Sequence, residues 1–204
     1  MRKQKDIFME SEGDAWFKRN LGDLGKHDPV TDAIVNAGIK PKCVLEVGCS
    51  NGWRLDKLRT IFGCGIMGVE PSRAAALNAA QRRIPVHQTT ASCIPVSAQG
   101  YDMVIYGFCL YLTDPDDWLL IASEGDRALA PGGHIVIHDF SSPDGLFCRE
   151  YEHDRRIRAY HANFQHLWLA HPLYETVCIA PGVGLEDRVI ILRKNPVNSI
   201  PVKP

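Results

Sequence analysis

From residue 41 onward, short apolar runs alternate with amphipathic stretches. The runs have the length of strands: Cys43 to Val47, Gly65 to Val69, Val86 to Gln88, Met103 to Tyr106, His134 to His138, Tyr174 to Ile179 and Val189 to Arg193. Helical spacing lies between them, over Arg54 to Ile61, Arg73 to Gln81, Asp116 to Leu129 and part of Gly145 to Leu169. This alternation is typical of βαβ units. We therefore predict a Rossmann-like α/β fold, a doubly wound and mainly parallel seven-stranded sheet with helices on both faces.

The segments outside this pattern suggest additions to one core. Residues 1–40 show helical spacing broken by glycines, which predicts two or three helices that form an N-terminal lid. The stretch 141–172 is longer than a simple connection and is expected to shape a substrate site within the core, 42–194. A chain of 204 residues has the usual size of one domain, so we expect 1–204 to be a single domain.

Composition narrows the class of partner. The chain is 45% hydrophobic and 23% charged with a formal net charge of −1, so no nucleic-acid partner is expected. No apolar run approaches about 20 residues and the charged start does not resemble a signal peptide, which predicts no membrane partner and a cytoplasmic location. The 7 cysteines lack Cys-x-x-Cys spacing. They are expected to be reduced thiols, with no metal site.

The turn from Glu46 to Gly52 is the first candidate binding loop. In open α/β sheets, ligands bind beyond the carboxyl ends of the strands, and glycine lets the backbone approach them closely. The sequence Glu46-Val47-Gly48-Cys49-Ser50-Asn51-Gly52 does not contain the Gly-x-Gly-x-x-Gly fingerprint of dinucleotide sites. The charge of Glu46 also disfavours a pyrophosphate, whereas it suits a cationic ligand without phosphate, such as S-adenosylmethionine.

A second acid, Glu70, ends the next strand and is followed by Pro71. A carboxylate at this position can accept hydrogen bonds from the two ribose hydroxyls of a nucleoside. Either acid alone could be solvated or could cap a helix. The two together favour a nucleoside ligand.

Four segments, in order, resemble the class I S-adenosylmethionine-dependent methyltransferases. The resemblance extends from Lys42 to about Lys194, and the segments are Val44 to Gly52, Gly68-Val69-Glu70-Pro71, Tyr101 to Ile105 and Leu129 to Ile137. It implies S-adenosylmethionine as the cofactor. The family usually has glycine where Ser50 stands, a position that a small serine can also occupy.

The resemblance implies cofactor contacts position by position. Glu46, Gly48 and Cys49 would line the methionine part, and Glu70 would bind the ribose. The loop from Thr90 to Ser92 would hold the adenine, although family members often have Asp at the place of Thr90. The predicted contacts of these loops are Glu46, Gly48, Cys49, Ser50, Gly52, Glu70, Pro71, Thr90, Ala91 and Ser92.

Two further groups complete this predicted cofactor site. Tyr106, Gly107 and Phe108 would lie beneath the transferred methyl group, with core packing as the alternative for the two aromatic residues. In the lid, Trp16, Arg19 and Asn20 could bound the methionine carboxylate and the adenine. Their alternative role is that of an amphipathic helix surface.

Methyl transfer from a sulfonium is an in-line displacement, so the protein must mainly align the reactants. A general base is needed only when the acceptor has to lose a proton early. The catalytic candidates are His138 and Asp139, which end the fifth predicted strand, and His161 in the insertion. His138 could equally be a hydrogen-bonded core residue.

The acceptor is expected to be a small polar molecule. The segment after the fourth predicted strand is not an Asn-Pro-Pro-Tyr type motif, which disfavours amide and adenine nitrogens, and no Asp ends that strand to hold Mg²⁺. The insertion loosely resembles small methyltransferases of bacterial surface-sugar pathways, so a sugar or sugar nucleotide is the leading interpretation. Arg155, Arg156 and Arg158 could meet its anionic group, or lie on a solvated helix face.

Two alternatives stay open. A scaffold or sensor that binds the cofactor without turnover would keep Glu46 and Glu70. A nicotinamide-dependent oxidoreductase would share the fold, but it should show the intact glycine fingerprint. The sequence gives no indication of the oligomeric state.

Overall fold

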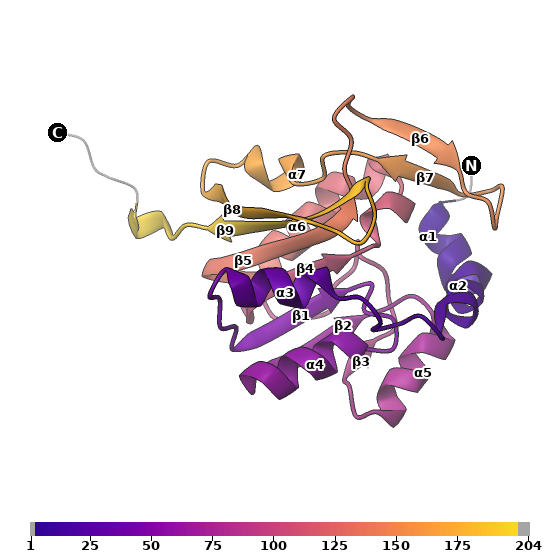
Figure 1. Ribbon diagram of the computed structural model, residues 1–204, viewed down its shortest axis with the longest axis horizontal. Helices are drawn as coiled ribbons and strands as arrows, with labels where there is room; N and C mark the ends of the chain where they lie inside the picture. Colours follow the sequence, from indigo (N-terminus) through magenta and orange to yellow (C-terminus); the bar gives the residue numbers. More distant parts are fainter. Residues whose placement is uncertain (1–2, 200–204) are drawn as a thin grey trace.

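A seven-stranded sheet forms the centre of the computed structural model, which describes residues 3–199 (Figure 1). The strands lie in the order β3 (Val86–His87), β2 (Gly65–Val69), β1 (Cys43–Val47), β4 (Tyr101–Gly107), β5 (Leu129–Phe140), β9 (Asp187–Lys194) and β8 (Tyr174–Pro181). Strands β1 to β5 pair in parallel, and β9 pairs antiparallel with both β5 and β8. The predicted fold class is confirmed.

Helices cover both faces of this sheet. On one face, α3 (Pro29–Asn36), α4 (Trp53–Phe62) and α5 (Arg73–Gln81) bury their apolar side chains against the strands, and on the other, α6 (Trp118–Ala128) and α7 (His166–Leu169) do so. Each face has its own apolar cluster, in which Leu55 and Trp168 are fully buried members. Two short 3₁₀ turns, η2 (Leu110–Leu112) and η3 (Pro115–Asp117), lead into α6.

The helices begin where local chemistry predicts. Ser72 caps α5, because its hydroxyl accepts a hydrogen bond from the N–H of Ala75 at 3.0 Å. Asp28 caps α3 in the same way, and Pro29 occupies the first position of that helix. α4 is instead bounded by Gly52 and Gly63, both in the left-handed region.

The strand register brings the loops after β1, β2 and β4 to one edge of the sheet. Val47 is paired with Val69 on one side and with Tyr106 on the other. Because all three strands run in the same direction, the residues that follow them meet at the carboxyl edge. This edge is where the sequence placed the binding loops.

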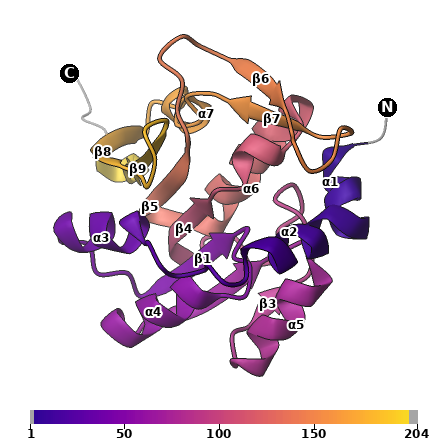
Figure 2. The same ribbon diagram turned by 45° about the vertical axis from the view of Figure 1, so that its right-hand side comes forward.

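The N-terminal segment is a helix that lies beside this edge, as Figure 2 shows. It consists of α1 (Gln4–Ile7), a π-helical turn η1 (Phe8–Glu12) and α2 (Gly13–Asn20), and α3 follows it before the sheet begins. The predicted helices before the core are therefore present. We call α1, η1 and α2 the lid.

The helix expected in part of Gly145 to Leu169 is present only at the end of this range. The structure has a two-stranded antiparallel sheet, β6 (Phe147–Glu150) and β7 (Arg158–His161), and only the short helix α7. Burial along β7 alternates, with Ala159 and His161 buried. The segment therefore has the two-residue period of a strand.

Over residues 3–199, no helix has both the length and the apolar character needed to cross a membrane. The structure also shows the cysteines of this range as free thiols.

Candidate functional site

A cleft of about 730 Å³, its open mouth included, lies at the carboxyl edge of the sheet beneath the lid. Its walls come from the lid, the β1 and β2 loops, the loop after β3 and the segment after β4. The predicted cofactor residues that line it are Trp16, Gly48, Glu70, Pro71, Thr90, Ala91, Gly107 and Phe108.

Among the described residues that line the cleft, Glu70 carries the only carboxylate. It is 7% exposed, its Oε2 accepts the N–H of Ser50 at 2.8 Å, and its Oε1 accepts the N–H of Ser72 at 2.8 Å. Burial raises the pKa of Glu70 to about 7, against the effect of the two backbone hydrogen bonds. Each oxygen keeps a lone pair for a further donor.

Glu46 lies behind the cleft, not on its wall. It is 1% exposed and pairs through Oε1 with the buried guanidinium of Arg54, whose Nε donates to Asp28 at 3.1 Å. Burial raises the pKa of Glu46 to about 7, and Arg54 acts in the opposite direction. The interpretation that the charge of Glu46 is available to a cationic ligand therefore needs correction, because Arg54 largely compensates that charge.

One oxygen of Glu46, Oε2, is buried and has no hydrogen-bond partner among residues 3–199. Gly107 separates this pair from the cleft. A Cβ at Gly107 would lie 2.6 Å from Nη1 of Arg54 and 3.2 Å from Oε1 of Glu46. A glycine is thus required here, and it keeps the backbone at the cleft floor free of a side chain.

The β1 loop is held to β2 by its backbone. The N–H groups of Gly48 and Cys49 both donate to the carbonyl of Val69, at 2.8 and 3.2 Å. Gly48, Ser50 and Gly52 all have positive φ, of 72°, 52° and 70°. Ser50 therefore takes a backbone conformation that normally favours glycine, which explains why the related family has glycine there.

Cys49, Ser50 and Gly52 support the loop from behind the cleft wall. Cys49 is 2% exposed, with its thiol against Gly68, and Gly52 packs so closely on Ile84 that a Cβ would lie 2.6 Å from Cγ2 of that side chain. These predicted cofactor residues shape the loop and do not line the cleft.

Comparison with known proteins identifies the family. A family model described as a methyltransferase domain matches residues 26–186. The chain belongs to the class I S-adenosylmethionine-dependent methyltransferases. Members of this family use S-adenosylmethionine, so the family and the cofactor expected from the sequence are confirmed.

The curated relatives are longer proteins. An uncharacterized protein of Haemophilus influenzae is 30% identical over 115 residues, which are 52% of this chain and 46% of the relative. An uncharacterized protein of Mycobacterium tuberculosis is 29% identical over 127 residues, 61% of this chain and 41% of the relative. The chain thus spans less than half the length of these relatives.

Solved structures show the same fold at low sequence identity. The 1,6-didemethyltoxoflavin-N1-methyltransferase of Burkholderia thailandensis, solved with 1,6-didemethyltoxoflavin and S-adenosylhomocysteine bound, has a TM-score of 0.73 and 18% identity. The match covers 95% of this chain and 87% of that one. A methyltransferase of Methanosarcina mazei has a TM-score of 0.66 and 17% identity, with 80% and 97% covered.

Three of the contacts that fix the lid of this methyltransferase to the body are made by Asp14, by Gln4 and by Glu12 with Arg19. Oδ1 of Asp14 accepts from the hydroxyl of Ser72 at 2.6 Å and from the N–H of Ala74 at 2.9 Å. The buried amide of Gln4 donates to the carbonyls of Leu112 and Arg158, at 2.9 and 3.2 Å. The third contact, described next, joins α2 to the segment between β6 and β7.

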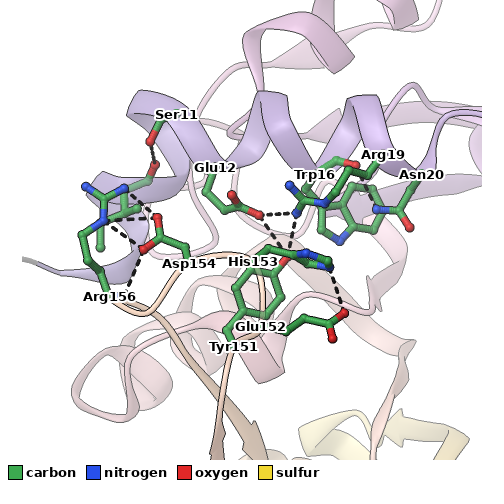
Figure 3. Close-up of polar contacts among 11 residues, drawn as sticks. Ser11, Glu12, Trp16, Arg19, Asn20, Tyr151, Glu152, His153, Asp154 and Arg156 are labelled. Atoms are coloured by element: carbon green, nitrogen blue, oxygen red, sulfur yellow. Dashed lines mark hydrogen bonds and ion pairs between the residues drawn. The ribbon is translucent and has the colours of Figure 1, made fainter.

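Glu12, Arg19 and Tyr151 form this third contact (Figure 3). The hydroxyl of Tyr151 donates to Oε1 of Glu12 at 3.0 Å and accepts from Nη2 of Arg19 at 3.1 Å, while Arg19 also pairs with Glu12. Asn20 bonds the carbonyl of Trp16 in its own helix. Of the three predicted lid contacts, only Trp16 therefore lines the cleft, while Arg19 holds the lid and Asn20 bonds within α2.

Tyr106 and Ser92 also lie off the cleft wall. Tyr106 is fully buried, its hydroxyl donates to the carbonyl of Ile121 at 3.1 Å, and its ring centroid is 5.1 Å from that of Trp168. Tyr106 is therefore packed in the core, as the alternative interpretation of this residue expected. Ser92 lies behind Thr90, with their hydroxyl oxygens 3.2 Å apart.

The three catalytic candidates of the methyltransferase do not line the cleft. Oδ2 of Asp139 accepts from the N–H of Leu110 at 2.9 Å, and Oδ1 accepts from the N–H of Phe140 at 2.9 Å. Burial raises the pKa of Asp139 to about 7, against these backbone hydrogen bonds. Its visible role is to hold the turn after β4, and a catalytic role stays a prediction.

His138 and His161 are both 3% exposed. Nε2 of His138 is 2.8 Å from Oδ2 of Asp187 in β9, which is the hydrogen-bonded core alternative. His161 is stacked between Phe140 and Phe147, with centroids 4.5 and 4.6 Å apart. Burial lowers the pKa of both histidines.

The arginines expected to meet an anionic acceptor are also away from the cleft. Arg156 pairs with Asp154 at 2.6 Å, and Arg158 donates to the carbonyl of Arg155 at 3.0 Å. They lie in the turn between β6 and β7 and at the start of β7, so the helix-face alternative is also wrong.

Several cleft residues escaped the sequence reasoning. They are Lys5, Phe8 and Gly13 of the lid, Val47, Val69, and Cys109, Leu112 and Thr113 after β4. The apolar spacing of the lid could have indicated Phe8. Val47 and Val69 end β1 and β2 beside predicted residues, so the direction of the strands could have indicated them. The others lie beyond sequence reasoning, because they reach the cleft only through the turn after β4 and the docking of the lid.

Proposed function

We propose that this methyltransferase transfers the methyl group of S-adenosylmethionine to a small molecule that binds between the lid and the end of β4. The observation that carries the proposal is the position of Glu70. Its two oxygens are held by the N–H groups of Ser50 and Ser72 at the wall of the cleft beneath the lid. A fixed, buried carboxylate with free lone pairs suits the pair of hydroxyls of a ribose.

Bound S-adenosylmethionine supplies a methyl group on an electrophilic sulfonium. Glu70 would accept the ribose hydroxyls, and the loop at Thr90 and Ala91 would lie against the adenine. Gly48 and Gly107 give the cofactor close access to the backbone.

The acceptor proposed is a small molecule, and the walls restrict its chemistry. Among the described residues that line the cleft there is no histidine, and the only carboxylate is Glu70. A sugar hydroxyl requires a base to become a good nucleophile. The sugar prediction therefore has no support from the cleft walls.

The remaining expectations are kept as proposals. A net charge of −1 offers no field that would gather a nucleic acid, so a nucleic-acid acceptor is not proposed. A cytoplasmic location is proposed because the cysteines are free thiols, as a reducing compartment would keep them.

Calorimetric titration tests the cofactor site. We expect micromolar binding of S-adenosylmethionine and none of NADH. Glu70→Gln keeps the shape of the side chain but removes its charge, and it should weaken binding by about 10- to 100-fold. Glu175→Gln, an exposed glutamate of β8, is the matched control and should bind as the natural chain does.

The outcomes separate the alternatives. Preference for NADH, or equal effects of the two substitutions, would refute the proposal. Binding of S-adenosylmethionine without methyl transfer to any acceptor of a broad small-molecule panel would instead favour a cofactor-binding scaffold or sensor.

A further inference from the structure

Phe108, which directly follows β4, belongs to an aromatic cluster and is its member on the cleft wall. Its centroid is 4.4 Å from that of His138, 5.3 Å from Phe140 and 5.9 Å from Tyr111, all in edge-to-face geometry. Tyr111 and Phe140 pack edge to face as well, at 5.1 Å. Phe108 also lines the cleft, so the cluster supports this ring from behind.

The backbone of Phe108 is in an unusual conformation. Its φ is 51°, and a bulky residue with positive φ is an outlier that persists only where its surroundings enforce it. The N–H of Phe108 donates to the carbonyl of His138 at 2.7 Å, which fixes the turn. A strained, firmly held aromatic residue at a cleft wall indicates a ligand platform.

The cleft wall around Phe108 is apolar. Phe8 and Trp16 reach it from the lid, and Leu112 from the turn after β4. The wall suits a flat, weakly polar molecule better than a polyhydroxylated one.

The charged groups of the described cleft wall are both engaged. Lys5 pairs with Asp117 at 3.1 Å, and the lone pairs that the backbone N–H groups leave free on Glu70 are assigned to the ribose in the function proposed above. No described group on this wall is therefore placed to remove a proton from an acceptor. The acceptor atom must be nucleophilic in the form in which it binds.

Building on the function proposed above, we propose that the acceptor is a planar aromatic nitrogen heterocycle that stacks on Phe108 and is covered by Trp16, with Phe108 as the residue that selects it. The lone pair of a neutral ring nitrogen forms the new N–C bond with the methyl carbon. The C–S bond breaks and its electron pair returns to sulfur, which gives S-adenosylhomocysteine. The product carries the positive charge, or loses a ring N–H proton to water if it has one.

Binding of matched acceptor probes in the presence of S-adenosylhomocysteine tests this proposal. The probes are a panel of quinoline, isoquinoline and pteridine, their fully reduced ring counterparts, and methyl glucoside. We expect at least one heterocycle to bind about tenfold more tightly than its reduced counterpart, and more tightly than the glucoside. Incubation with S-adenosylmethionine should then add one methyl group to its ring nitrogen, as seen by mass spectrometry.

Two variants isolate the ring of Phe108. Phe108→Leu removes aromaticity, and Phe108→Gly removes the side chain in a conformation that glycine adopts freely, so at least this variant should fold. Both should lose the heterocycle preference when binding is measured at S-adenosylhomocysteine concentrations that saturate each variant. Phe62→Leu, at the end of α4 on the other face of the sheet, is the control that should keep it.

A heterocycle preference that survives in both Phe108 variants would overturn the proposal, as would tighter binding of the reduced rings or the glucoside across the panel. Failure of the proposed function is a separate result, because the natural chain would then not bind S-adenosylmethionine at all.

Discussion

The backbone N–H of Ser50 donates to Oε2 of Glu70 at 2.8 Å, which joins the loop after β1 to the acid that ends β2. The parallel register of β1 and β2 places the two loops side by side. The positive φ of Ser50 turns its N–H toward the carboxylate. The glycine-rich loop therefore has a second function besides close approach, since it orients the residue proposed to bind the ribose.

Ser50→Gly should stabilise the protein. A residue with a Cβ in the left-handed region costs roughly 1 kcal/mol relative to glycine. We expect the free energy of unfolding in urea to rise by up to about 1 kcal/mol, with the cofactor affinity unchanged because the N–H to Glu70 remains. Ser50→Ala keeps the Cβ and is the control. Ser50→Ala also removes the buried, unpartnered hydroxyl, so a gain in Ser50→Gly no larger than that in Ser50→Ala would show that backbone strain at Ser50 is not the cause.

The affinity for S-adenosylmethionine should depend on pH through Glu70. Burial raises the pKa of Glu70 to about 7, so the carboxyl is ionised above this pH and protonated below it. Protonation removes acceptor capacity, so the affinity should fall severalfold as the pH drops from 8 to 6. Calorimetry at several pH values measures this. In Glu70→Gln, the pH dependence of the affinity should shrink, and what remains should come from Glu46, whose pKa burial also raises to about 7. An unchanged pH dependence in this variant would contradict the assignment of Glu70 to the cofactor.

Gly13→Ala should displace the lid. A Cβ at Gly13 would lie 2.7 Å from the carbonyl oxygen of Phe8 and 3.2 Å from Cα of Ser72. We expect at least about tenfold weaker S-adenosylmethionine binding, with the sheet intact by circular dichroism. Gly22→Ala is the matched control, because a Cβ there meets nothing within 4 Å. Equal affinities for the two variants would mean that the lid does not cover the cofactor.

Tyr151→Phe should loosen the lid at its contact with the segment between β6 and β7. The change removes one hydrogen bond each from Glu12 and Arg19, and Glu12 is 4% exposed. Leaving a buried charged group with fewer partners costs about 1–3 kcal/mol, so amide exchange in the lid should become faster by about tenfold or more. Tyr160→Phe is the control, since among residues 3–199 the Tyr160 hydroxyl makes no hydrogen bond. Faster exchange in both variants would contradict the specific role of Tyr151.

The sequence predicted the central sheet closely. β1, β2 and α5 have the bounds that the apolar runs indicated, because a strand buried on both faces needs a continuous apolar run and Ser72 marks the start of α5. It also predicted Glu70 and Gly107 at the cleft, since the carboxyl ends of parallel strands share an edge. These features depend on local pattern and on the direction of the strands.

The tertiary structure alone decided the roles of the charged and aromatic residues. The sequence shows Glu46 at the end of a strand, but only the fold places Arg54 against it. Likewise, His138 and Asp139 end β5, yet Asp187 and the turn after β4 engage them. A side chain's partners are set by which distant segments pack around it, so the pattern along the chain located the loops of the cleft while packing determined which aromatic residues line it.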